Sequence, residues 1–301
     1  MTAREPSTFV CTITPFDAEA RLDDEAATVL YGRLASAGVG AYVGSSSPGE
    51  GYALSLSETE RLYGIALAAV DGRVPIRAMG VEPHTPEQLV SLIRLAESCH
   101  LDAMQLYCLD AGHGNKPNPG ELERYFRGLL ETMRLPAVLS SHVFNGYVVE
   151  PELVDRLLRD YEHVIGINVT NPDIAYVSRI IDVVDGRADV HVGGPMQAVS
   201  ALALGAQGFL GTEGNLDPWA CAAVIEHYRA GNLAGTFAAY SKIIRLFSMN
   251  VWPGGSMRWL KAAMKVLDLP GWHLRPPWLA LDDDAHARIA VQLEALGVTG
   301  R

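Results

Sequence analysis

The segment at residues 164–193, VIGINVTNPDIAYVSRIIDVVDGRADVHVG, decides how this chain folds. Residues 164–168 and 190–193 are short and rich in valine and isoleucine, which predicts two buried strands. Residues 174–184 between them repeat apolar side chains at helical spacing, which predicts a helix. A strand, a helix and a second strand in this order predict a parallel sheet with crossover helices.

The same alternation runs through most of the chain. Short apolar runs bounded by turn residues predict strands at residues 8–14, 41–44, 76–81, 103–108, 137–141, 164–168, 190–193 and 208–211. Helical patterns lie between them, at residues 57–70, 86–99, 120–133, 151–161, 174–184 and 196–204. Eight such strands suit closure into a (β/α)8 TIM barrel of the α/β class. A doubly wound open sheet is the alternative, but no Gly-x-Gly-x-x-Gly follows the first strand to support it.

Signals at the helix starts and the pattern near the chain end set the domain prediction. Ser57 with Glu60 predicts a capping box, and Pro86 and Pro151 suit the first turn of a helix. After Gly214 the pattern is helical to the end of the chain. We therefore predict a single domain, with the barrel in residues 1–220 and a C-terminal helical extension in residues 221–301 packed on it.

Composition excludes several classes of protein. A net charge of −11 and the lack of any basic run argue against a nucleic-acid partner or an anionic membrane surface. The first residues have no apolar segment of signal-peptide type, and no apolar run reaches the length of a membrane-spanning helix. The four scattered cysteines suggest reduced thiols. The composition therefore predicts a cytoplasmic protein. Independently of composition, we expect no cofactor and a small-molecule substrate.

A series of motifs resembles one known family over nearly the whole chain. The motifs are, in chain order, Thr14-Pro15-Phe16, Ser46-Ser47-Pro48-Gly49-Glu50, Asn115-Lys116-Pro117, Ile165-Gly166-Ile167, Gly205-Ala206-Gln207-Gly208 and Arg275-Pro276-Pro277-Trp278. The set is similar to the dihydrodipicolinate synthase and N-acetylneuraminate lyase superfamily of class I aldolase-type barrels. The resemblance implies a TIM barrel, a lyase that joins its substrate to a lysine as an imine, and a homodimer or homotetramer.

The chain departs from that family at its functional positions. The resemblance puts the imine-forming lysine at Asn168, the tyrosine of the fifth strand at Ser140, and a carboxylate-binding arginine near Asn145. If the family loop is aligned on Gly49 and Glu50, the resemblance puts Pro48, which lacks a backbone N–H, where the loop offers one; aligned on Gly44, the loop has a two-residue insertion instead. Because an amide nitrogen is not nucleophilic, we expect a divergent member without the Schiff-base lysine. An ordinary aldolase using Lys116 remains a remote alternative.

Polar residues at the predicted strand ends supply the candidate site. His142 is the first acid–base candidate, since histidine ordinarily titrates near neutral pH; a histidine bonded to its own loop is the structural alternative. Glu213 is a second candidate or an anchor for a cationic group, with a salt bridge to arginine as the alternative. Asn168 could polarise a substrate oxygen, as amides do in oxyanion holes. The expected substrate-binding residues are Ser46, Ser47, Tyr107, His113, Ser140 and Gly194.

Three further residues carry weaker expectations. We expect Glu50 to brace the loop after the second strand. We expect no metal site, because no ligand pair has metal-binding spacing and strand alternation points His191 outward. Trp252 is a lesser candidate for a pocket wall or a subunit interface.

These features leave two hypotheses about function. The first is a lyase that acts on a small polar carbonyl or carboxylate substrate by acid–base chemistry without a lysine imine. Retro-aldol cleavage, dehydration and enolisation are its natural reactions. The alternative is a catalytically inactive barrel that binds a small ligand or a partner protein. The retained histidine and other polar strand-end residues favour the enzyme.

Overall fold

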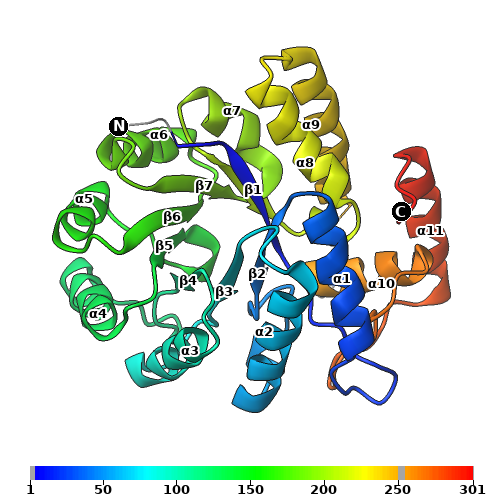
Figure 1. The fold of residues 1–301 in the computed structure, drawn as a ribbon, viewed down its shortest axis with the longest axis horizontal. Coiled ribbons are helices and arrows are strands. Elements are labelled where there is room, and N and C mark those ends of the chain that lie inside the picture. Colours follow the sequence, from blue (N-terminus) through cyan, green and yellow to red (C-terminus); the bar gives the residue numbers. More distant parts are fainter. Residues whose placement is uncertain (1–3, 250–254, 301) are drawn as a thin grey trace. The chain divides into compact units, whose positions relative to one another are not determined.

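A computed structural model confirms the predicted (β/α)8 barrel. It describes residues 4–249 and 255–300. Trp252, the lesser candidate for a pocket wall or subunit interface, lies outside the described residues. Parallel strands close the barrel in chain order from β1 to β8 (Figure 1). The strands are β1 (Ser7–Cys11), β2 (Gly40–Val43), β3 (Ile76–Met79), β4 (Ala103–Leu106), β5 (Ala137–His142), β6 (Val164–Thr170), β7 (Asp189–Gly193) and β8 (Gly208–Gly211).

Helices connect the strands and follow the last of them. The helices are α1 (Asp24–Ser36), α2 (Leu56–Val70), α3 (Pro86–Ser98), α4 (Pro119–Thr132), α5 (Pro151–Asp160), α6 (Ile174–Val184), α7 (Ala198–Ala203), α8 (Pro218–Arg229), α9 (Leu233–Ser248), α10 (Gly255–Val266) and α11 (Asp283–Ala295). The C-terminal helices predicted beyond the barrel are therefore present. None of the described helices is both long and apolar enough to cross a membrane.

The predicted cap of α2 is wrong by two residues. Ser55 is the N-cap: its hydroxyl accepts from the Glu58 backbone N–H at 3.2 Å, and the Glu58 carboxylate accepts from the Ser55 N–H at 2.9 Å. The sequence contains the capping-box pattern twice, at residues 55–58 and 57–60. Both copies satisfy the local rule, so the pattern alone could not choose between them.

Strands β5 and β6 extend beyond their predicted ends. They pair as far as Ser140 with Asn168 and His142 with Thr170, whereas the sequence pattern predicted ends at residues 141 and 168. The last residues, His142 and Thr170, are polar and partly exposed, so hydrophobicity gave no sign that the strands run as far as these positions, although Val169 before Thr170 is apolar and buried. The extension keeps His142 on regular backbone at the carboxyl end of β5.

The chain forms two compact units. Of the described residues, the first unit contains those up to Ser7 and Arg77–Leu210, and the second contains Thr8–Ile76 and those from Gly211 onward. In the first unit, α3 to α6 cover the outer side of β4 to β7 (Figure 1). In the second, Trp259 of α10 is fully buried among apolar side chains of α1, α9 and α11, which include Leu30, Leu246 and Ile289.

Candidate functional site

Asn168 of β6 and Gln105 of β4 meet inside the barrel. The Asn168 Nδ2 donates to the Gln105 Oε1 at 2.5 Å, although β5 lies between their strands. Side chains of alternate strands meet on the interior of a barrel, so both residues point inward. Asn168 is 3% exposed, and its Oδ1 has no hydrogen-bond partner among the described residues. An unmet buried acceptor costs about 1–3 kcal/mol, which makes this position a candidate for function.

Tyr147 brings a phenol to the interior end of β5. Its hydroxyl donates to the Ser140 Oγ at 3.1 Å, and Ser140 is the register partner of Asn168. Burial raises the pKa of Tyr147, so the phenol stays protonated and serves as a donor. The sequence pattern does not identify Tyr147, because this residue lies five residues beyond the strand, in a turn that no strand-end pattern marks.

His142 ends β5 and caps the short 3-10 helix η2 (Val143–Asn145). The backbone N–H of Asn145 donates to the His142 Nδ1 at 3.2 Å. A backbone N–H can only donate, so the Nδ1 carries no proton and the neutral ring holds its proton on Nε2. Burial lowers the pKa of His142 to about 4. The predicted acid–base candidate is therefore an uncharged imidazole at neutral pH.

Asn145 joins the loops that follow β3, β4 and β5. Its Nδ2 donates to the carboxylate of Glu82, which follows β3. Its carbonyl oxygen accepts from the Lys116 Nζ at 2.7 Å, in the loop between β4 and α4. The next residue, Gly146, has a φ of +82°, and a Cβ there would lie 2.4 Å from the Lys116 Cε. The left-handed backbone of the turn therefore favours glycine at this position.

Each of the four lysines in the sequence lies outside the barrel strands. Lys116 binds the Asn145 carbonyl, and Lys242 of α9 binds the Asp217 carboxylate at 2.6 Å. Lys261 of α10 binds Glu50, and the Lys265 Nζ lies 4.8 Å from the centre of the Trp272 ring. No lysine therefore lies on a barrel strand.

Three predicted binding residues of the first unit lie in different surroundings. Tyr107 is buried, with its ring centre 6.4 Å from that of His142. His113 is exposed in the loop after β4. Gly194 follows β7 with a φ of +76°, and its N–H donates to the Leu210 carbonyl at 2.7 Å. The structure thus brings Tyr107 to His142 and leaves His113 facing solvent.

The outward orientation expected for His191 is wrong. His191 is the register partner of Asn168, and partners on neighbouring strands face the same side of the sheet. Its Nε2 lies 2.8 Å from the Ser7 Oγ, and burial together with Arg77 lowers its pKa to about 3. Within residues 4–249 and 255–300, no group of three or more histidine, cysteine, aspartate or glutamate side chains could hold a metal ion.

In the second unit, the loop after β2 is fixed by Glu50. The Glu50 carboxylate is fully buried and accepts from the Lys261 Nζ and from the Arg275 backbone N–H. The bracing role expected of Glu50 is confirmed. Burial lowers the pKa of Lys261 to about 8. In the same loop Ser46 is half-buried, and the exposed Ser47 places its Oγ 3.0 Å from the Ser256 Oγ.

Glu213 lies in the second unit, in the short 3-10 helix η4 (Glu213–Asn215). It is 1% exposed, and its carboxylate accepts from the N–H and the hydroxyl of Thr212 at 3.0 and 3.1 Å. Burial raises its pKa to about 7. Its charge contributes to the raised pKa values of the buried thiols Cys11 and Cys221, behind the larger effect of their own burial. The alternative prediction for Glu213 was a salt bridge to an arginine. The hydrogen bonds that its carboxylate accepts come from Thr212 instead.

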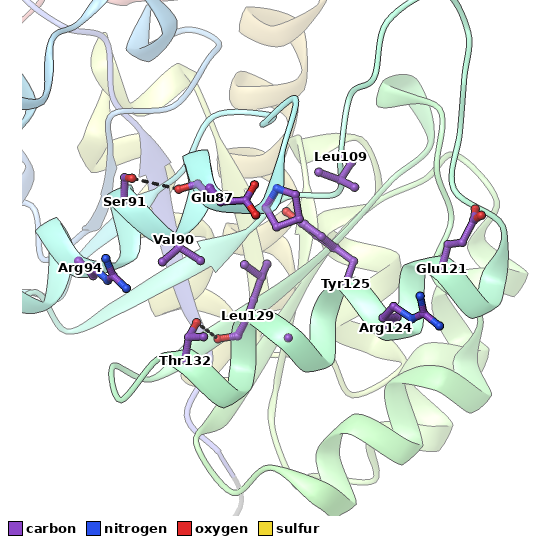
Figure 2. Close-up of a pocket in the computed structure, with 12 residues that line it drawn as sticks. Glu87, Val90, Ser91, Arg94, Leu109, Glu121, Arg124, Tyr125, Leu129 and Thr132 are labelled. Atoms are coloured by element: carbon purple, nitrogen blue, oxygen red, sulfur yellow. Dashed lines mark hydrogen bonds between the residues drawn. The ribbon is translucent and has the colours of Figure 1, made fainter.

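A separate groove of about 520 Å³ lies between α3 and α4 (Figure 2). Val90 and Leu129 form part of its apolar floor, and Arg94 and Arg124 lie along its sides. None of the predicted site residues lines it. This groove on the helices is therefore distinct from the candidate site at the strand ends.

Known proteins match almost the full length of the chain. A family model described as the dihydrodipicolinate synthetase family matches residues 6–296. A 4-hydroxy-tetrahydrodipicolinate synthase from Methanoculleus marisnigri is 33% identical over 226 residues, which cover 74% of this chain and 76% of that protein. YagE, a prophage protein of the dihydrodipicolinic acid synthase family from E. coli K12 solved with pyruvate, has a TM-score of 0.89 at 23% identity, covering 97% of this chain and 99% of that one. A monomeric dihydrodipicolinate synthase variant also has a TM-score of 0.89, at 22% identity and 97% coverage of both chains.

Proposed function

Because this chain belongs to the dihydrodipicolinate synthetase family, we propose that it is a lyase that works without a lysine imine. Its substrate in this proposal is a small polar molecule with a carbonyl or carboxylate group. The observation that carries the proposal is the placement of the lysines: none lies on a barrel strand, and Asn168 takes an inward position on β6. An amide cannot attack a carbonyl to form an imine, so acid–base chemistry must activate the substrate.

The proposed roles follow from the chemistry of each side chain. Asn168 polarises a substrate oxygen, and His142 and Glu213 are the acid–base groups. Retro-aldol cleavage, dehydration or enolisation would each use such groups. The proposed substrate-binding residues are Ser46, Ser47, Tyr107, His113, Ser140 and Gly194.

Borohydride trapping tests the absence of an imine. The protein is incubated with pyruvate, reduced with borohydride and weighed by mass spectrometry, and we expect no covalent adduct. The Asn168→Lys variant is the positive control, because it places a primary amine at the inward position on β6 and should give a trapped adduct. A stable adduct on the unaltered chain would overturn the proposal.

A non-catalytic barrel is the second candidate. Its support is the filled interior of the first unit, where Gln105, Tyr107, Ser140 and Asn168 are all buried. Deuterium exchange separates the two candidates, since a lyase that enolises its substrate should exchange the C3 protons of a 2-oxo acid in D2O. Exchange that depends on the protein and is lost in a His142→Asn variant supports the lyase. Absence of exchange over a series of 2-oxo acids supports the non-catalytic barrel.

We also propose that the chain assembles as a homodimer or homotetramer in the cytoplasm. The support for assembly is the family resemblance, although one structural neighbour is described as a monomeric variant. Light scattering on the eluting protein gives the mass directly. A mass equal to a single chain of 32.5 kDa would reject the assembly.

A further inference from the structure

The turn that follows β5 fixes the chemical form of His142. We infer that His142 acts as an uncharged hydrogen-bond donor through its Nε2, not as the base, and that Asn145 is the positioning residue that holds it in this form. The inference rests on the proposed function for the reaction that it serves. The form of the ring itself follows from the contacts of the turn alone.

The Nδ1 of His142 is not free to take a proton. It accepts from the Asn145 backbone N–H at 3.2 Å, so its lone pair is already engaged. Charging the ring would also cost the free energy of burying an imidazolium, and burial lowers the pKa of His142 to about 4. At neutral pH roughly one ring in a thousand is then charged. The remaining polar group, Nε2–H, is a donor.

Asn145 is held by two further contacts, so its N–H stays directed at the ring. Its side-chain Nδ2 binds Glu82, and its carbonyl binds Lys116 at 2.7 Å. Gly146 follows with a left-handed backbone that accommodates the Lys116 side chain. The Tyr147 N–H then returns to the His142 carbonyl at 3.4 Å and closes the turn. Through these contacts, the loops after β3 and β4 help to keep the proton of His142, at the end of β5, on its Nε2.

A donor at this position suits the formation of an enolate. In such a step a C–H bond next to the substrate carbonyl breaks, and its proton passes to a base. The electron pair forms a carbon–carbon double bond, and the carbonyl oxygen takes the negative charge. The Nε2–H of His142 stabilises that oxygen, as preorganised donors do at developing oxyanions. In this inference the base is a carboxylate: either Glu213, as in the proposed function, or Glu82, whose carboxylate accepts from the Asn145 Nδ2.

Nitrogen NMR tests the inference without any ligand. In protein labelled with 15N-histidine, two-bond correlations to the ring protons distinguish a protonated from an unprotonated ring nitrogen. We expect His142 to show a single neutral form, with its proton on Nε2, from about pH 5 to about pH 8. We also expect its titration midpoint near 4. A proton on Nδ1, or a midpoint near the ordinary histidine value, would overturn the inference.

Two matched variants test the role of the turn. Asn145→Ala keeps the backbone N–H and the carbonyl bond to Lys116 but loses the side-chain bond to Glu82, so the Nε2–H form should remain but in a smaller share. Gly146→Ala places a Cβ against Lys116 on a left-handed backbone, so the turn should open, both tautomers should appear and the midpoint should rise. A thermal melt confirms that each variant is folded. An unchanged spectrum in either variant contradicts the positioning role.

Replacements of His142 separate its donor function from its capping function. Asparagine retains an acceptor for the Asn145 N–H but has no group at the Nε2 position, whereas glutamine places an amide N–H there and loses the cap. In the deuterium-exchange assay we expect His142→Asn to lose about a hundredfold in rate and His142→Gln to retain more activity. The opposite order would contradict the donor role. An adduct in borohydride trapping would defeat the proposed function alone and leave the NMR result intact.

Discussion

The Nδ2 of Asn168 donates to the Oε1 of Gln105 at 2.5 Å, across the width of β5. The Asn168 Nδ2 and the Gln105 Oε1 are paired inside the barrel, so the loss of either side chain leaves the other group without this partner. We predict that Asn168→Leu and Gln105→Leu each lower the free energy of unfolding by about 1–3 kcal/mol. The double variant should cost less than the sum of the two, because it removes both partners. Urea unfolding of the four proteins measures the coupling, and strict additivity would contradict a direct bond.

Glu213 should make stability depend on pH. Burial raises its pKa from 4.5 to about 7 in the folded protein, so folding favours the protonated carboxyl. Its contribution is therefore fully present below about pH 4.5 and is lost as the pH rises through about 7, a change on the order of 3 kcal/mol. The Glu213→Gln variant has no titrating carboxyl at this position, so it lacks this pH-dependent contribution to the free energy of unfolding. Relative to that variant, the unaltered protein should lose stability between pH 5 and pH 8, as measured by urea unfolding at each pH. If the difference in unfolding free energy between the two proteins stayed constant over this pH range, the pKa of Glu213 would not be raised by folding.

The buried pair of Glu50 and Lys261 should be sensitive to the loss of one partner. Lys261→Met leaves the Glu50 carboxylate buried without its cation, which should cost about 3–5 kcal/mol in unfolding free energy. Lys242→Met is the matched control, since the Lys242–Asp217 pair is partly exposed and should contribute about 1 kcal/mol or less. Equal losses in the two variants would mean that burial does not distinguish the pairs.

Glycines at two positions should respond to alanine in opposite directions. A Cβ on Gly193, at the end of β7, would lie 1.8 Å from the Thr170 Oγ1, so Gly193→Ala should destabilise the protein by about 1–3 kcal/mol. Adding Thr170→Ala should recover part of that loss. Gly128, inside α4, has no atom within 4 Å of its ideal Cβ, so Gly128→Ala should stabilise the protein by about 0.4–1 kcal/mol. Thermal melts show whether each variant gains or loses stability. An unchanged melting temperature in Gly193→Ala would contradict the close approach to Thr170.

The sequence predicts the barrel because each of its units carries a local signal. The apolar runs and helical spacing of residues 164–193 depend only on neighbours in the chain, and the structure has β6, α6 and β7 there. The ends of elements were less predictable. The cap at Ser55 competes with an equal pattern at residues 57–60, and the polar residues that complete β5 and β6 lack the apolar signal of a strand.

The contacts of the candidate site could be predicted only in part. Strand-end position identified His142 and Asn168, because residues at the carboxyl ends of barrel strands share one face. The partners of these residues depend on strand register and turn shape, which no local pattern encodes. Gln105 reaches Asn168 through the register of three strands, and Asn145 reaches the His142 ring through a tight turn. The outward orientation expected for His191 was wrong for the same reason, because it depends on the register of β7 against β6.

The ion pair of Glu50 and Lys261 also sets an order for synthesis. The two residues are 211 positions apart, so the loop after β2 emerges from the ribosome long before its cation. Until α10 has been made, the Glu50 carboxylate has no Lys261 to meet and must remain in water. The loop can therefore take its final form only after translation has passed α10, near the end of the chain.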